Sequence, residues 1–80
     1  MRLDKFLKVS RIIKRRTIAN EACDGGKILV NEKIARASYD VKIGDKITVN
    51  MGREPLKVEV IAINEYATKD NASFMYKAIE

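Results

Sequence analysis

Apolar side chains near the start of the chain recur at the spacing of one helical face. Positions i, i+3, i+4 and i+7 of that face are occupied by Leu3, Phe6, Leu7 and the small Ser10. The stripe breaks after Val9, and the isoleucine pair at 12–13 fits a connection that packs its apolar side chains beneath it. A first short amphipathic helix is therefore predicted from Arg2 up to this break.

A second short helix is predicted to begin near Arg16 or Thr17, with Thr17 as its N-cap. Its narrow apolar face is formed by Ile18, Ala19, Ala22 and Cys23. Most of these side chains are small, which allows close approach to a neighbouring element. Cys23 is expected to be a core residue, because no base or cation beside it would activate the thiol. The glycine pair at 25–26 ends the helix.

Beyond residue 26 the apolar pattern changes from helical spacing to alternation. Strands are predicted at 27–30, 33–35, 46–49, 56–63 and, as a last edge strand, 74–79. Turns are predicted at 43–45, at 52–55 and at Asn31–Glu32, where glycine would be usual in the second position. Residues 67–73 are polar and small and are expected to form a loop. The predicted fold class is α+β: two short N-terminal helices followed by a small, mostly antiparallel β-sheet.

The length of 80 residues limits the functions that the chain could perform. Such a chain is expected to bury only about 60% of its unfolded surface, which allows a single domain over 1–80 but no roomy active site. The chain has no histidine and one cysteine, which excludes the usual nucleophile pairs, zinc ligand sets and internal disulfides. We therefore expect no enzyme activity, no cofactor and no metal. No apolar stretch approaches the roughly 20 residues that a bilayer requires, and Arg2 and Lys5 interrupt any signal peptide, so a cytoplasmic location is expected.

Positive charge is concentrated near the N-terminus. The chain has 16 basic and 11 acidic residues. Residues 1–40 contain ten basic and five acidic residues, whereas residues 41–80 contain six of each. Such a patch suits a polyanion, because each neutralised phosphate releases counterions, although many basic runs are only solvated faces. Within 1–16 the only acidic residue is Asp4, which is expected to orient an arginine or cap locally rather than to catalyse. The candidate RNA contacts are Arg2, Lys5, Lys8, Arg11, Lys14, Arg15 and Arg16.

Five short motifs, in this order, resemble the S4 RNA-binding domain. They are Arg2–Leu7, Ser10–Arg11, Arg15–Thr17, Gly26–Asn31 and Val41–Val49. The resemblance covers about residues 1–50, and 51–80 add C-terminal strands. Two departures fall in turns: Asn31–Glu32 replaces the usual Asn-Gly, and Ile43 stands where proline is common. Both affect loop geometry and leave the basic helices unchanged.

The resemblance implies an S4-like, or alpha-L, fold in which basic helices face RNA phosphates. The chain is similar to the small stand-alone members, which include a heat-shock ribosome-binding protein and a protein of ribosome-associated quality control. These members imply large-subunit ribosomal RNA as the partner and peptidyl-tRNA as a further candidate. They also imply that an RqcH-like factor on the same subunit adds a C-terminal tail to the stalled chain. The expected protein is a non-catalytic monomer with no membrane partner.

Several alternatives stay open from the sequence. The chain could be the S4 portion of a pseudouridine synthase or of a tyrosyl-tRNA synthetase, which would need a catalytic domain outside these residues. It could also assist ribosome assembly or RNA modification. A basic amphipathic helix can lie on anionic lipid, although the first helix needs its apolar stripe for the core. Lys33 and Arg36 could extend the RNA surface or could be solvated strand ends.

Overall fold

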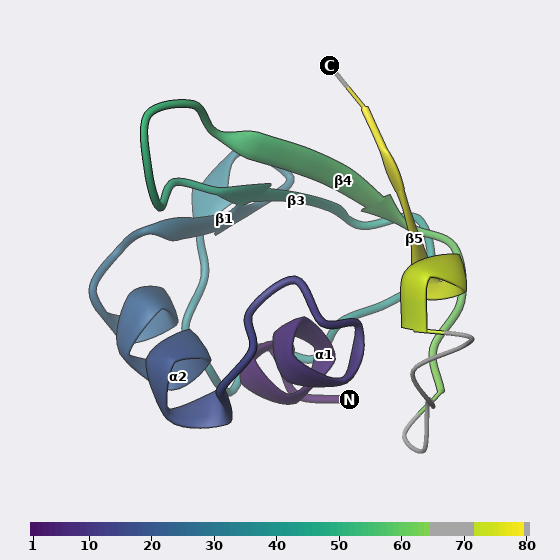
Figure 1. Cartoon of the computed structure of the whole chain (residues 1–80), viewed down its shortest axis with the longest axis horizontal. Coiled ribbons are helices and arrows are strands. Elements are labelled where there is room, and N and C mark those ends of the chain that lie inside the picture. The colour runs from purple at the N-terminus through teal and green to yellow at the C-terminus, as the bar shows by residue number, and fades with distance from the viewer. Residues whose placement is uncertain (65–71, 80) are drawn as a thin grey trace.

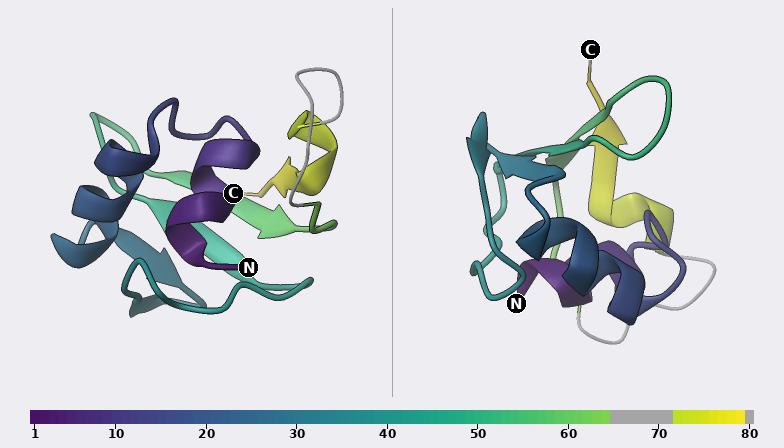
Figure 2. Two further views of the ribbon diagram at one scale, coloured as in Figure 1. Left: turned by 90° about the horizontal axis from the view of Figure 1, so that it is seen from below. Right: turned by 90° about the vertical axis from the view of Figure 1, so that its left-hand side faces the viewer.

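The computed structural model describes residues 1–64 and 72–79 and arranges them in two layers (Figure 1). Two helices, α1 (Leu3–Val9) and α2 (Arg16–Asp24), pack on one face of a five-stranded antiparallel sheet (Figure 2). The strands are β1 (Ile28–Val30), β2 (Lys33–Ile34), β3 (Lys46–Val49), β4 (Leu56–Val60) and β5 (Tyr76–Ala78). The predicted α+β fold class is confirmed. None of the helices in the described ranges is long and apolar enough to cross a bilayer.

The strand order is β2-β1-β3-β4-β5, and every neighbouring pair is antiparallel. β5 is an edge strand, as predicted. The predicted strand bounds are wrong by one residue at 27, 35 and 79, and by two or more residues at two other ends. The strand predicted over 56–63 ends at Val60, because the N–H groups of Ile61 and Ala62 both donate to the carbonyl of Met75 (2.9 and 3.2 Å) and break the regular ladder. The last strand begins at Tyr76 rather than at residue 74, because a 3₁₀ helix, η1 (Ala72–Met75), precedes it. Of the loop predicted over 67–73, residues 67–71 lie outside the described residues.

The core lies between the helices and the sheet and uses the predicted stripe of α1. Leu3, Phe6 and Leu7 are fully buried. Ser10 is buried as well, and its hydroxyl donates to the carbonyl of Leu7 (3.3 Å), so the polar group is satisfied. The sheet contributes its alternate, inward-facing side chains, Ile28, Val30, Ile47, Val49, Val58 and Val60. Burying the stripe on the sheet leaves the rest of the α1 surface for charged residues.

The connection between the helices turns sharply at Arg11, whose φ of 64° lies in the left-handed region. The N–H groups of Arg11 and Ile13 donate to the carbonyls of Lys8 and Leu7, both at 3.0 Å. Ile13 is buried and Ile12 is half-buried, which confirms that this pair packs beneath a connection.

Two predictions about α2 are wrong. The N-cap is Arg15, whose extended backbone precedes the helix and whose side chain makes no capping hydrogen bond, whereas Thr17 is already helical. Ala19, Ala22 and Cys23 are buried as predicted, but Ile18 is 41% exposed. Ile18 faces the turn between β3 and β4 rather than the core.

The β1–β2 turn explains how this chain does without the usual glycine. Asn31 and Glu32 both have positive φ, 52° and 70°, as a two-residue type I′ turn requires. The Asn31 side chain donates to Oδ1 of Asp45 and accepts from the N–H of Lys46, both at 3.1 Å. Asp45 is buried and also accepts from the hydroxyl of Tyr39 (2.9 Å). These tertiary hydrogen bonds stabilise a backbone conformation that Glu32 alone would disfavour.

Candidate nucleic-acid interface

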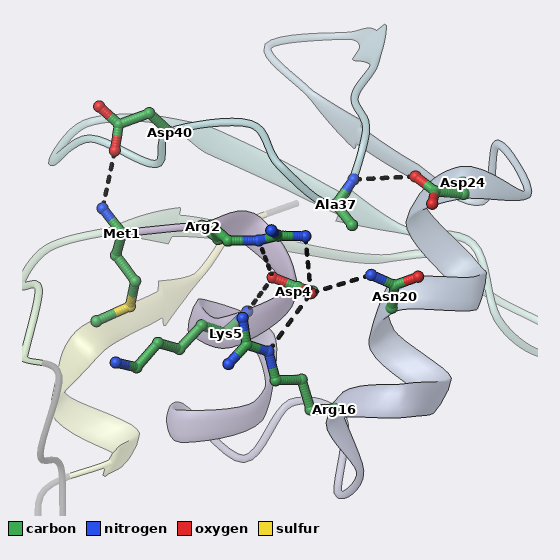
Figure 3. A network of polar contacts seen from close by, with 9 residues as sticks. All are labelled: Met1, Arg2, Asp4, Lys5, Arg16, Asn20, Asp24, Ala37 and Asp40. Atoms are coloured by element: carbon green, nitrogen blue, oxygen red, sulfur yellow. Dashed lines mark hydrogen bonds and ion pairs between the residues drawn. The ribbon is translucent and has the colours of Figure 1, made fainter.

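A buried carboxylate joins the two helices (Figure 3). Asp4 lies in the first turn of α1 and is 2% exposed. It accepts hydrogen bonds from the N–H of Lys5 (2.8 Å), Nε and Nη2 of Arg2 (3.2 and 3.5 Å), Nδ2 of Asn20 (3.2 Å) and Nε of Arg16 (3.4 Å). We call Arg2, Asp4, Arg16 and Asn20 the arginine cluster. The prediction that Asp4 orients an arginine is confirmed, and it orients two.

The backbone around each arginine determines where its side chain starts. Arg2 is the N-cap of α1, and its backbone pairs with Asp40 in an antiparallel bridge. Arg16 is the first residue of α2, and Asn20 follows one turn later on the same side of that helix. Arg16 and Asn20 lie 12 and 16 positions after Asp4 in the sequence. The packing of α1 against α2 brings the donor groups of both residues to the Asp4 carboxylate.

Each arginine of the cluster is held on one edge and open to solvent on the other. The side chains of Arg2 and Arg16 are 51% and 48% exposed, while that of Asp4 is 3% exposed. Arg16 reaches Asp4 through Nε, and within the described residues its two terminal amino groups have no partner. The planar guanidinium fork suits bidentate contacts to a phosphate. Because Asp4 already restricts both side chains, phosphate binding would cost less conformational entropy.

The ionisation of Asp4 depends on these donors. Burial of the carboxyl group by itself raises its pKa, because burial disfavours the charged form. The hydrogen bonds from Asn20, from the two arginines and from the Lys5 N–H outweigh burial and hold the pKa of Asp4 below its ordinary value. Asp4 is therefore a carboxylate at neutral pH and accepts hydrogen bonds only.

The structure does not bring all seven predicted contacts together. Arg2 and Arg16 meet at Asp4, and Lys5 borders the cluster through its backbone N–H. Lys8, Arg11 and Lys14 instead line a separate depression of about 340 Å³ near the C-terminal end of α1. Lys14 and Arg15 line an apolar groove beside the β3–β4 turn.

Sequence reasoning missed Asn20. Its spacing of four residues from Arg16 is the signal that could have identified it, because residues i and i+4 share one helical face. Arg36, whose role the sequence left open, lines the same depression as Arg2. Lys33 lines a neighbouring depression, together with Tyr39 and Arg36 itself. Arg36 therefore borders both depressions, and Lys33 borders only the one without Arg2.

Cys23 lies behind this surface, in the core. Burial raises the pKa of the Cys23 thiol to about 11, and the charges of Asp4 and Asp24 add to the shift. The thiol is thus protonated at neutral pH and buried, which confirms the expectation of a core residue.

Comparison with known proteins identifies the family. The S4 domain family profile matches residues 1–47, more than half of the chain. This chain belongs to the S4 family. The S4 protein is 49% identical over 80 residues to the RQC P-site tRNA stabilizing factor of Bacillus subtilis, covering 100% of this chain and 93% of that relative. It is 48% identical over 77 residues to the factor of the same name from Halalkalibacterium halodurans, covering 96% and 88% of the two chains.

Solved structures agree with this assignment. The S4 protein superposes on the trimeric structure of Vibrio cholerae heat shock protein 15 with a TM-score of 0.92 and 30% identity, covering 99% of this chain and 81% of that one. The solution structure of the hypothetical protein HP1423 gives a TM-score of 0.83 at 27% identity, covering 100% and 98% of the two chains. The resemblance to small S4 proteins of ribosome-associated quality control, and to their heat-shock relatives, is confirmed.

Proposed function

We propose that this S4 protein is a non-catalytic factor that binds structured ribosomal RNA of the large subunit through the arginine cluster. The observation that carries the proposal is the pair of half-exposed guanidinium groups fixed on one buried carboxylate. A-form RNA has a deep, narrow major groove, so a protein reads it mainly through shape, phosphates and 2′-hydroxyls. Two rigid helices that present oriented arginines fit that mode of recognition.

The names of the relatives support a narrower role. Proteins 48 and 49% identical to this chain are named for stabilising P-site tRNA in RQC. We therefore propose that the protein acts in the cytoplasm on large subunits that carry obstructed peptidyl-tRNA. There it would hold RNA in place while an RqcH-like factor extends the C-terminus of the stalled chain. The single domain over 1–80 and the monomeric state stay predictions.

Two measurements in cells test the role. Deleting the gene is expected to reduce or abolish C-terminal tailing of chains from stalled ribosomes. Crosslinking the protein to RNA and sequencing the attached fragments is expected to recover large-subunit ribosomal RNA. Intact tailing after deletion, together with loss of one ribosomal or transfer RNA modification, would instead favour a modification or assembly partner.

The affinity for ribosomal RNA is expected to depend strongly on salt. If the surface neutralises about five phosphates, log K should fall against log salt with a slope of roughly −3.5 to −4.5, between the single-strand and duplex limits. Titrating a labelled RNA fragment with the protein at several potassium chloride concentrations measures this slope. An affinity that does not change with salt would rule out a phosphate-dominated interface.

A further inference from the structure

The β3–β4 turn and α2 flank an apolar groove whose lining includes none of the four residues of the arginine cluster. Both elements lie on the left-hand side of the molecule in Figure 1. Three large side chains line the groove although they are not buried: Ile18 is 41% exposed, Met51 40% and Leu56 42%. The volume of the groove is about 420 Å³. Single exposed apolar residues are ordinary on a protein surface, but several gathered in one concave site are typical of a binding surface.

Cationic side chains flank these apolar residues. Lys14 and Arg15 line the groove on the side of the α1–α2 connection, and Glu54 is the one acidic residue among its described lining residues. The groove therefore combines an apolar floor with a net positive rim. An occupant with complementary chemistry has apolar side chains flanked by carboxylates.

The lining also favours protein over RNA as the occupant. Unpaired RNA bases are usually held by stacking on aromatic rings or on arginine planes. The apolar side chains described in this groove are aliphatic or thioether and include no aromatic ring, and Arg15 on the rim is the one arginine among the described lining residues. Such a lining suits the aliphatic side chains of an amphipathic segment, which a groove recognises at helical spacing.

A second copy of this chain fits the groove poorly. A two-fold interface places the same patch of both protomers face to face. The two rims would then face each other, each with the cations Lys14 and Arg15 against the single carboxylate of Glu54, and this net like charge opposes association. The charge of the rim thus favours a different chain.

We propose that this groove binds an acidic amphipathic segment of another protein. Lys14 and Arg15 are also candidate RNA contacts, so the apolar residues Ile18, Met51 and Leu56, which carry no charge and lie outside the arginine cluster, are the part of the groove that distinguishes protein binding from RNA binding. It adds a direct protein contact to a molecule for which the proposed function assigns direct contacts only to RNA.

Photocrosslinking followed by reconstitution tests this proposal. A diazirine amino acid is introduced in place of Met51, cells are irradiated, and the crosslinked partner segment is sequenced. We expect a segment of another protein that carries carboxylates beside aliphatic residues. A crosslink to RNA, a crosslink to a second copy, a partner segment without carboxylates, or no crosslink would each overturn the proposal.

The synthetic peptide of the crosslinked segment is then titrated with the purified protein. The double variant Met51→Gln, Leu56→Gln is expected to bind the peptide at least about 10-fold more weakly, because it removes two apolar contacts. Ile43→Gln is the matched control, since Ile43 is 67% exposed and is not among the residues lining the groove. Equal loss in the control, or unchanged binding in the double variant, contradicts the assignment. A thermal melt verifies the fold, and retained RNA affinity in the double variant separates this groove from the proposed RNA surface.

Discussion

Replacing both Arg2 and Arg16 by alanine is expected to weaken association with the large ribosomal subunit at least roughly 100-fold. A charge-assisted hydrogen bond contributes about 1.5 to 3 kcal/mol, and 1.4 kcal/mol corresponds to about a factor of ten in affinity. The two effects need not add, because both side chains share Asp4. Co-sedimentation with purified large subunits measures the change, and tailing of stalled chains should be lost with it.

The fold of this double variant should survive, since both arginines are about half exposed and Asp4 keeps the donors Lys5 and Asn20. The matched control is Lys57→Ala with Lys77→Ala, which removes the same charge from exposed positions on the outer face of the sheet. Unchanged binding in the arginine variant would place the RNA surface elsewhere, and an equal loss in the lysine variant would mean that only net charge matters. Arg16→Lys keeps the charge without the planar fork and should lose part of the affinity.

Replacing Asp4 by asparagine is expected to weaken RNA binding although it makes the protein more positive. An amide nitrogen would face donors from Arg2, Arg16 or Asn20, so buried hydrogen bonds would be lost and both arginines would lose their common anchor. The expected cost to stability is about 1 to 3 kcal/mol, and each kcal/mol corresponds to about 4 to 8 °C in Tm for a domain of this size. Calorimetry and RNA titration of one preparation measure both effects.

Asp24→Asn is the matched control for this charge change. Asp24 is exposed, and Oδ1 accepts from the N–H of Ala37 (3.2 Å), a bond that an amide oxygen can keep. If charge alone governed binding, both variants would bind RNA more tightly than the wild type. Tighter binding by the Asp4 variant would therefore contradict a positioning role for Asp4.

The pH dependence of stability gives a second measure of Asp4. Its native pKa is lower than the ordinary value of 3.8, so the folded protein binds this proton more weakly than the unfolded chain does. The stabilisation is complete above the ordinary pKa and is lost as the pH falls through the native pKa. The stability advantage of the wild type over Asp4→Asn should thus be constant near neutral pH and should shrink below pH about 3.8.

Asp4 also marks the limit of what the sequence could predict about the site. Seven basic residues within 1–16 predicted a basic surface, because charge density along a short segment is a local property. Which of them act together depends on how α1 packs against α2, and that packing selects Arg2 and Arg16 through one carboxylate. Lys8 and Arg15 are equally basic, yet they line different depressions.

The order of elements followed from local patterns, because helical stripes, strand alternation and paired glycines each depend on neighbours a few positions away. The buried stripe of α1, the end of α2 at Gly25 and the antiparallel sheet were all predictable in this way. Contacts between distant segments decided the rest. The hydrogen bonds of Asn31 with Asp45 and Lys46 stabilise a turn without glycine. Ile18 fits the apolar spacing of the helix but lines an open groove. Whether a side chain is buried depends on whether another element of the fold covers it, and the spacing of residues along the chain does not contain this information.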